Sequence, residues 1–285
     1  MSSLCIKTNN EEVLSYLQNE FSSFNMLNTF YSRKEFKHYK NIIIHYTGID
    51  KELFYTKLAT ILSYLVIDYF EPNIIKNILN ANYFYFENTE FNKILDLCEE
   101  NLCEDDEFSF QDRQLALFDI FYEYISSNNT IILTGFINFR LANYRKILEE
   151  LVDFSVNEFI IEREYLEFIS LLRLYVNSQP SSNMEVHAIS FNDEILLLDE
   201  NMNQIPIDKK ALNAKYLSDV SFSNNDYILN TLLNLLPQKI HLHLVQLSCN
   251  LDFINTLQLV FEKRIKICHN CNICNLYKKL SIKNN

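Results

Sequence analysis

The stretch KIHLHLVQLSCNLDFINTLQLVFEKRIKIC, residues 239–268, has the pattern of a strand, a helix and a second strand. KIHLHLV (239–245) alternates in polarity, LDFINTLQLVFEK (251–263) has apolar residues at helical spacing, and RIKIC (264–268) alternates again. A helix between two such strands almost always makes a right-handed crossover that leaves the strands parallel. The stretch therefore predicts a βαβ unit with two parallel strands.

Two further strand-like segments precede this unit. EVHAISF (185–191) and EILLLD (194–199) flank Asn192-Asp193, a two-residue turn typical of a hairpin. NMNQIPID (201–208) is a candidate third strand. The C-terminal part of the chain is thus expected to contain a hairpin and a βαβ unit.

The middle of the chain is dominated by helical patterns. EFNKILDLCEENL (90–102) and FQDRQLALFDIFYEYI (110–125) each predict a helix, and a longer pattern follows as two apolar stripes, one from Leu141 to Phe159 and one from Tyr165 to Val176. We expect Leu148, Leu151 and Phe159 of the first stripe to pack against the second.

The N-terminal region predicts strands at LCIKT (4–8) and NIIIH (41–45), with a helix at NEEVLSYLQNEF (10–21) between them. The fold class is therefore α+β. The expected regions, which are also compatible with one compact domain, are an N-terminal α/β sub-region (1–70) and a main region (71–285) that holds a helical block (89–179), a C-terminal α/β part (184–274) and a basic tail (275–285).

Composition and charge exclude some classes of partner and cellular location. The 285 residues are 48% hydrophobic with only 2 Gly and 4 Pro, which suits helices joined by short connections. The net charge of -12 argues against nucleic acid as a partner. The N-terminus lacks the pattern of a signal peptide, and the longest apolar run, Leu58 to Ile67, is too short for a membrane span. We therefore expect a cytoplasmic protein with reduced thiols.

The strongest chemical signal is a cysteine cluster. RIKICHNCNIC (264–274) places Cys268, Cys271 and Cys274 at C-x2-C-x2-C spacing, which is improbable by chance in a chain with 7 cysteines. Thiolates at this spacing converge on one ion, and zinc or an iron–sulfur cluster takes four such ligands. The cluster is therefore a candidate metal site, with a redox thiol site or a thiol-rich tail as the alternatives.

A fourth ligand has to come from elsewhere in the chain. Cys249 is the first candidate, because it follows the strand before the crossover helix and Cys268 ends the strand after it. The carboxyl ends of parallel strands share one edge of a sheet, so the two thiols should lie close together. His269 is the second candidate. Around zinc the sulfurs should lie within about 4 Å of one another, and around an iron–sulfur cluster about 6–7 Å apart.

Two weaker candidates remain. His241 and His243 are two residues apart on a strand, so both imidazoles face one side and could bind a metal, although a half-exposed strand face is the simpler interpretation. A carboxylate patch lies near the junction of the two helical stripes, where a solvated face is the simpler interpretation; it consists of Glu158, Glu162, Glu164 and Glu167. Gly48 and Gly135 stand alone, so no phosphate-binding loop is indicated.

Three segments carry a family resemblance: TGFINFRLANYRKILEELVDFSVNEFIIEREYLEFISLLRLYV (134–176), EVHAI (185–189) and RIKICHNCNIC (264–274). Together they resemble the YtxC-like family of candidate sporulation proteins, over about residues 67–274. The resemblance implies a cytosolic protein of endospore-forming bacteria, without established enzymatic activity and without assigned catalytic residues. It favours a non-enzymatic protein that acts by binding a protein partner; the alternative is a metal- or cluster-dependent protein that uses the cysteine cluster.

Overall fold

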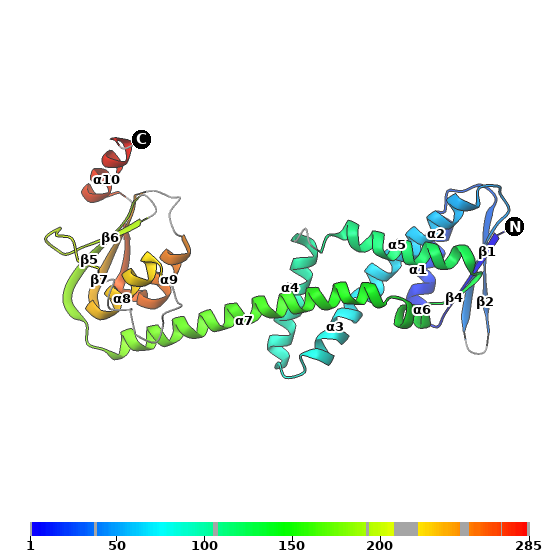
Figure 1. Cartoon of the computed structure of the whole chain (residues 1–285), viewed down its shortest axis with the longest axis horizontal. Helices are drawn as coiled ribbons and strands as arrows, with labels where there is room; N and C mark the ends of the chain where they lie inside the picture. Colours follow the sequence, from blue (N-terminus) through cyan, green and yellow to red (C-terminus); the bar gives the residue numbers. More distant parts are fainter. Residues whose placement is uncertain are drawn as a thin grey trace. The chain divides into compact units, whose positions relative to one another are not determined.

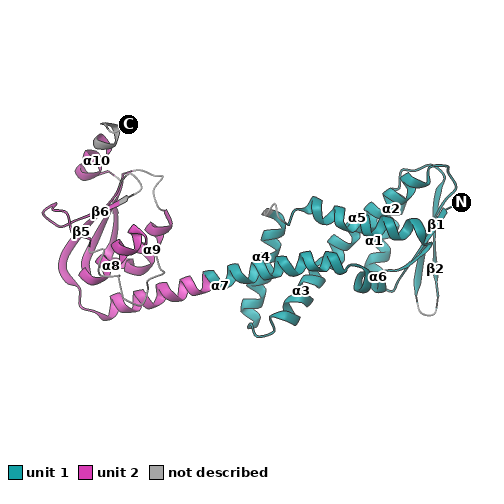
Figure 2. Ribbon diagram, viewed as in Figure 1, with its two compact units in different colours: residues 1–161 teal, residues 162–285 magenta. Residues whose placement is uncertain are grey.

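The computed structural model describes residues 2–36, 39–104, 108–191, 194–207, 222–245, 251–268 and 270–283. These residues form two compact units, residues 1–161 and residues 162–285 (Figure 2). The fold is α+β, as predicted. The predicted N-terminal sub-region and most of the predicted helical block share one hydrophobic core in the first unit, which extends from Leu4 to Phe159 along the chain.

The first unit contains a four-stranded sheet with the strand order β2-β3-β1-β4 (Figure 1). Its strands are β1 (Ser2–Thr8), β2 (Thr29–Glu35), β3 (Lys40–Tyr46) and β4 (Thr130–Ile132). Neighbouring strands run antiparallel except β4, which pairs in parallel with β1 although it lies far away in sequence. Side chains of β1 alternate between buried and half-buried, so one face of the sheet packs on the core.

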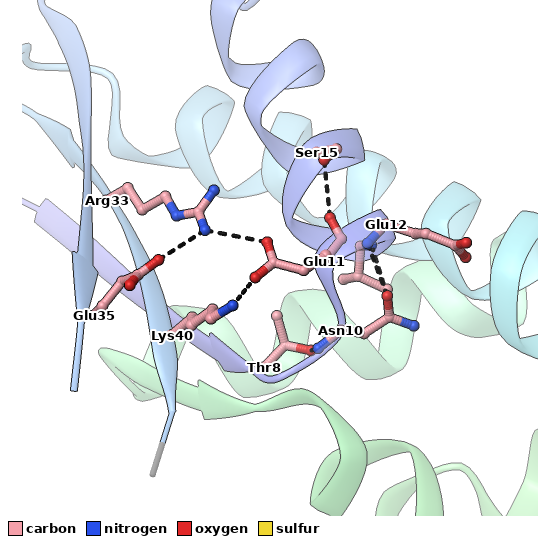
Figure 3. Close-up of polar contacts among 9 residues, drawn as sticks. Thr8, Asn10, Glu11, Glu12, Ser15, Arg33, Glu35 and Lys40 are labelled. Carbon is pink, nitrogen blue, oxygen red and sulfur yellow. Dashed lines mark hydrogen bonds and ion pairs between the residues drawn. The ribbon is translucent and has the colours of Figure 1, made fainter. Parts of the chain in front are cut away.

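Polar contacts at the N-terminus of α1 (Glu11–Ser22) fix this helix to the sheet (Figure 3). The Asn10 side chain accepts hydrogen bonds from the backbone N–H groups of Glu12 (2.8 Å) and Val13 (3.3 Å), as a helix N-cap does. Glu11 forms ion pairs with Arg33 on β2 and Lys40 on β3. The helix that the sequence predicts over residues 10–21 is thus confirmed, with Asn10 as its N-cap.

Helices complete the first unit. They are α2 (Lys51–Leu65), a π-helical turn (Val66–Phe70), α3 (Glu71–Asn82), α4 (Asn88–Glu104), α5 (Phe110–Ser127), α6 (Leu133–Arg140) and the start of α7 (Ala142–Ser178). Pro72 lies just after the π-helical turn, at the start of α3. A buried cluster joins three of these helices, because Glu71 of α3 pairs with Arg113 of α5 and accepts a hydrogen bond from Tyr144 of α7.

The two predicted long stripes belong to one continuous helix, α7. Leu148 and Leu151 are fully buried and Phe159 nearly so, as expected, but they pack in the core of the first unit. The expectation that they pack against the second stripe was wrong, because both stripes lie at different points along one continuous helix and belong to different cores. Ile169 and Val176 of the second stripe belong to the core of the second unit.

The segment Lys51–Asn82 is, among the described residues, the one helical segment long and apolar enough to cross a membrane by length and composition. Core helices of folded domains have the same properties, and 44% of its most apolar part is buried inside this structure. Phe54, Leu58 and Leu62 lie fully buried in the first core.

The second unit contains a four-stranded sheet with the order β6-β5-β7-β8. Its elements, beyond the end of α7, are β5 (Ser182–Phe191), β6 (Glu194–Leu198), α8 (Asn224–Leu235), β7 (Pro237–Leu244), α9 (Leu251–Phe261), a 3-10 turn (Glu262–Arg264), β8 (Ile265–Cys268) and α10 (Asn272–Lys283). The antiparallel β5–β6 pair confirms the hairpin, and the parallel β7–β8 pair across α9 confirms the βαβ unit. The hairpin turn, Asn192-Asp193, lies outside the described residues.

One expectation for this unit needs correction. NMNQIPID does not form a third strand within its described residues 201–207, where Gln204 makes only an isolated bridge to Leu198. The Asp199 side chain explains the difference, because it accepts the N–H groups of Asn201 and Asn203 and holds these residues in a turn. The basic segment that the sequence places at 275–285 is helical as far as Lys283, where α10 ends.

Candidate metal centre

The two faces of the C-terminal sheet have opposite character. Ile240 and Leu242 of β7 point to one face and join the core formed with α8, α9 and the end of α7. His241 and His243 alternate with them and therefore lie on the other face. The parallel register pairs His241 with His187 on β5 and His243 with Cys268 on β8. Three strands thus bring three imidazoles and one thiol onto one face.

The start of α10 supplies two more thiols. Cys271 immediately precedes the helix, and Cys274 lies in its first turn. The backbone N–H of Cys274 points at the Cys271 sulfur at 3.5 Å, and the N–H of Asn275 donates to the Cys271 carbonyl at 3.0 Å. The two-residue spacing therefore turns both sulfurs toward the sheet.

Four donor atoms converge where β7, β8 and α10 meet. The candidate ligand atoms of His243, Cys268, Cys271 and Cys274 all lie within 4.8 Å of one another. The Cys274 sulfur is 3.7 Å from that of Cys271 and 3.9 Å from that of Cys268. Nδ1 of His243 is 3.4 Å from the sulfurs of both Cys271 and Cys274. No other group of this kind occurs among the described residues.

These distances fit a tetrahedral metal site. Four ligands around one zinc ion, with zinc–sulfur bonds of about 2.3 Å and zinc–nitrogen bonds of about 2.0–2.1 Å, lie roughly 3.8 Å apart for two sulfurs and roughly 3.6 Å apart for sulfur and nitrogen. The four separations given above match this geometry, and the remaining two, from Cys268 to Cys271 and to His243, are at most 4.8 Å. They are too short for an iron–sulfur cluster, whose cysteine sulfurs lie about 6–7 Å apart because each binds a different iron.

The environment of His243 prepares its ring for metal binding. The side chain is only 3% exposed, and its Nε2 lies 3.0 Å from Nδ1 of His187. Burial, followed by the neighbouring rings of His187 and His241, lowers the pKa of His243 to about 4. The imidazole is therefore neutral at pH 7, and the tautomer with its proton on Nε2, hydrogen-bonded to Nδ1 of His187, is the one that would leave the Nδ1 lone pair free to bind a metal.

The thiols differ in their acidity. Burial alone would raise the pKa of Cys271, but the Cys274 N–H and the thiols of Cys268 and Cys274 lower it below the ordinary value. Burial raises the pKa of Cys274 to about 11. Cys271 therefore ionises more readily than an ordinary thiol. Cys274 would lose its proton only when a bound cation displaces it.

His241 has a different role from His243. Its Nε2 lies 2.8 Å from a carboxylate oxygen of Glu185, which also pairs with Lys239. Hydrogen bonds from Lys239 and His241 lower the pKa of Glu185 to about 2. Of the two histidines predicted as a pair of ligands, only His243 converges with the thiols.

The predicted ligands Cys268, Cys271 and Cys274 are brought together as expected. Cys249 and His269, the two candidates for the fourth ligand, lie outside the described residues. The structure supplies His243 as a fourth donor instead. The strand register could have indicated it, because the parallel pairing of β7 and β8 places His243 directly opposite Cys268.

The carboxylate patch on α7 shows no comparable convergence. Glu162, Glu164 and Glu167 are exposed, and Glu158 accepts a hydrogen bond from Asn101 at 3.1 Å. The six cysteines that the structure describes are all free thiols.

Comparison with known proteins places the site in a family context. The model of the YtxC-like family matches residues 56–266. The uncharacterized protein YtxC of Bacillus subtilis (strain 168) is 22% identical over 204 residues, which cover 69% of this chain and 71% of that protein. No solved structure matches the chain. Cys268, Cys271 and Cys274 all lie beyond the region that the family model covers, whereas His243 lies within it.

Proposed function

The chain belongs to the YtxC-like family, and we propose that its C-terminal unit binds a structural zinc ion through His243, Cys268, Cys271 and Cys274. The observation that carries this proposal is the convergence of four donor atoms within 4.8 Å of one another. Three sulfurs and one nitrogen form a donor set that zinc prefers over harder cations such as magnesium or calcium.

The number of ligands favours a structural role over a catalytic one. Catalytic zinc sites have three protein ligands and keep a fourth position for water or substrate, whereas structural sites are closed by four protein ligands. Here the chain itself offers four. Three of these donors are thiols, which also makes the set resemble structural sites.

The proposed ion would attach α10 to the sheet. Without it, the apolar contacts of α10 are few: Ile273 and Tyr277 pack against a small cluster formed by Ile189, Leu198 and Val245. An ion held by His243 of β7, Cys268 of β8 and two thiols of α10 would cross-link all three elements. The metal would thus replace the hydrophobic core that this end of the unit lacks.

The proposal is tested by metal content. We expect about one zinc ion per chain, measured by mass spectrometry of elements in protein purified without chelator or oxygen. His243→Ala and Cys271→Ser should lose the ion. His241→Ala and Cys103→Ser are matched controls, because His241 pairs with Glu185 and Cys103 is an exposed thiol of the other unit.

Two outcomes would contradict the proposal. Protein without bound zinc, or with an iron–sulfur absorption spectrum, would show that the donors hold something else or nothing. Equal zinc content in His243→Ala and His241→Ala would exclude His243 as a ligand and return attention to Cys249 and His269.

We further propose that the protein acts in the cytoplasm of an endospore-forming bacterium by binding a protein partner during sporulation. The family resemblance supports this proposal, and so does an apolar stripe on α7: Ile161, Phe168 and Tyr175 recur every seven residues and are exposed, as are Leu171 and Leu174 nearby. Deleting the gene should reduce spore yield and leave vegetative growth nearly normal. A strain with normal spores and impaired growth would contradict it.

A further inference from the structure

A pocket of about 350 Å3 lies on the first unit, beside α6. Its lining includes Tyr124 of α5, Ile132 of β4, and Gly135, Phe136, Phe139 and Arg140 of α6. This volume lies within the range of sites for small organic ligands. The stretch that forms α6 also belongs to the segment with the strongest family resemblance, and the metal centre assigns it no role.

Gly135 is the first indication that the pocket serves a ligand. The chain has only 2 glycines, and this one lies inside a helix, where glycine is less favourable than alanine. Its backbone does not adopt a positive φ angle, so its conformation does not require glycine. A Cβ atom added here would meet nothing closer than Ile132 Cγ2 at 4.0 Å. Neither backbone geometry nor packing within the chain explains the glycine, whereas an occupant of the pocket would.

The pocket combines a fixed aromatic wall with a cation. Phe136 is buried and stacks on Phe121 at 4.7 Å between ring centroids, while Tyr124 meets it edge-on at 4.9 Å. The Arg140 guanidinium lies 5.9 Å from the Tyr124 ring centroid. Within the described part of the chain, no hydrogen bond or ion pair joins the Arg140 side chain to another residue. Phe139 is 83% exposed at the rim.

We propose that this pocket binds a small carboxylate with an apolar or aromatic body. The body would contact Phe136, Phe139 and the space left by Gly135, and the carboxylate would pair with Arg140. A guanidinium matches the two oxygens of a carboxylate in one plane. Arg140 is the one charged residue in the pocket lining, and its positive charge selects an anionic ligand.

The small number of glycines allows a direct test. Protein labelled with 15N only at glycine should give two amide signals by NMR, one from Gly48 and one from Gly135, and Gly135→Ala identifies the second by removing it. We would titrate with 4-phenylbutyrate as the probe. The Gly135 signal should shift in a saturable manner with a millimolar Kd, as expected for a fragment of this size. The Gly48 signal is the internal control and should not move.

Three comparisons test the chemistry. The neutral analogue 4-phenylbutan-1-ol should bind about three- to fivefold more weakly than 4-phenylbutyrate, since an exposed ion pair contributes modestly. Arg140→Gln should remove this preference, while Lys146→Gln, an exposed cation that does not line the pocket, should retain it. Because the Cβ has room, Gly135→Ala should fold and weaken both probes, followed through an Ile132 methyl signal.

The proposal would be overturned if 4-phenylbutyrate left the Gly135 signal in place, or moved both glycine signals alike. Equal binding of acid and alcohol, or an unchanged preference in Arg140→Gln, would exclude the carboxylate contact. Full binding by Gly135→Ala would show that the glycine does not keep space for the ligand.

Discussion

The two glycines of the chain provide an opposed pair of stability predictions. At position 135, replacing glycine by alanine adds a Cβ with free space around it and removes the entropic cost of glycine in a helix. At position 48, the added Cβ would lie 2.2 Å from the hydroxyl oxygen of Tyr46. The same substitution should therefore stabilise the protein at one site and destabilise it at the other.

Moving the Tyr46 side chain away from the added Cβ would cost free energy, because several contacts hold it in place. It is buried, stacks on Phe54 with ring centroids 5.1 Å apart, and accepts a hydrogen bond from the backbone N–H of Asp50 at 3.1 Å. Overpacking of this kind costs about 1–3 kcal/mol. Gly135→Ala should instead raise the free energy of unfolding by about 0.5–1 kcal/mol.

The assay is thermal unfolding followed by circular dichroism, because most of the first unit is helical. For a domain of this size, 1 kcal/mol corresponds to a shift of about 2–4 °C. The melting temperature should thus rise by roughly 1–4 °C in Gly135→Ala and fall by roughly 2–12 °C in Gly48→Ala. Shifts of the same sign, or a lower melting temperature for Gly135→Ala, would refute the reasoning and show that Gly135 is needed for folding.

Three other predictions concern core packing, ion pairs and the candidate metal site. Leu151→Ala should cost about 2–5 kcal/mol, because this side chain is fully buried, and an unchanged urea midpoint would contradict its place in the core. Glu71→Gln leaves the Arg113 charge buried without its ionic partner and should cost about 3–5 kcal/mol, whereas the exposed pairs of Arg33 should each contribute at most about 1 kcal/mol on double-mutant analysis. His187→Ala should weaken zinc binding about 10- to 100-fold in competition with a chelator, because it removes the hydrogen-bond partner that orients His243, and unchanged affinity would refute this role.

The elements that the sequence predicted correctly are those whose own residues show a clear strand or helix periodicity. β7, α9 and β8 switch clearly between the periods of strand and helix, and the stripes of α7 mark its buried faces in each core. β2 has no such pattern: its residues, Thr29–Glu35, are mostly exposed at the edge of the sheet, so pairing with β3 rather than burial makes them a strand. α10 was missed because its sequence is largely polar.

The candidate metal site was predictable in part for a similar reason. Spacing along the chain identified Cys268, Cys271 and Cys274, because ligands separated by two residues converge through a local turn. The assignment of His243 depends on which strand lies beside β8 and in what register, and this information is not local. The failure of NMNQIPID as a strand is local in origin: Asp199 accepts the N–H groups of Asn201 and Asn203, each at 2.8 Å, and holds a turn.

The parallel pairing of β1 with β4 has a consequence for biosynthesis. Cys5 pairs with Thr130, so the chain must be extended through almost the whole first unit before this edge of β1 can be covered. Until then β1 is a strand with an unpaired backbone edge and an apolar face, which is a template for pairing with other chains. Translation that stalls before residue 130, or a fragment that ends there, should therefore produce a species prone to aggregation, and a β4 of only three residues prevents this in the finished protein.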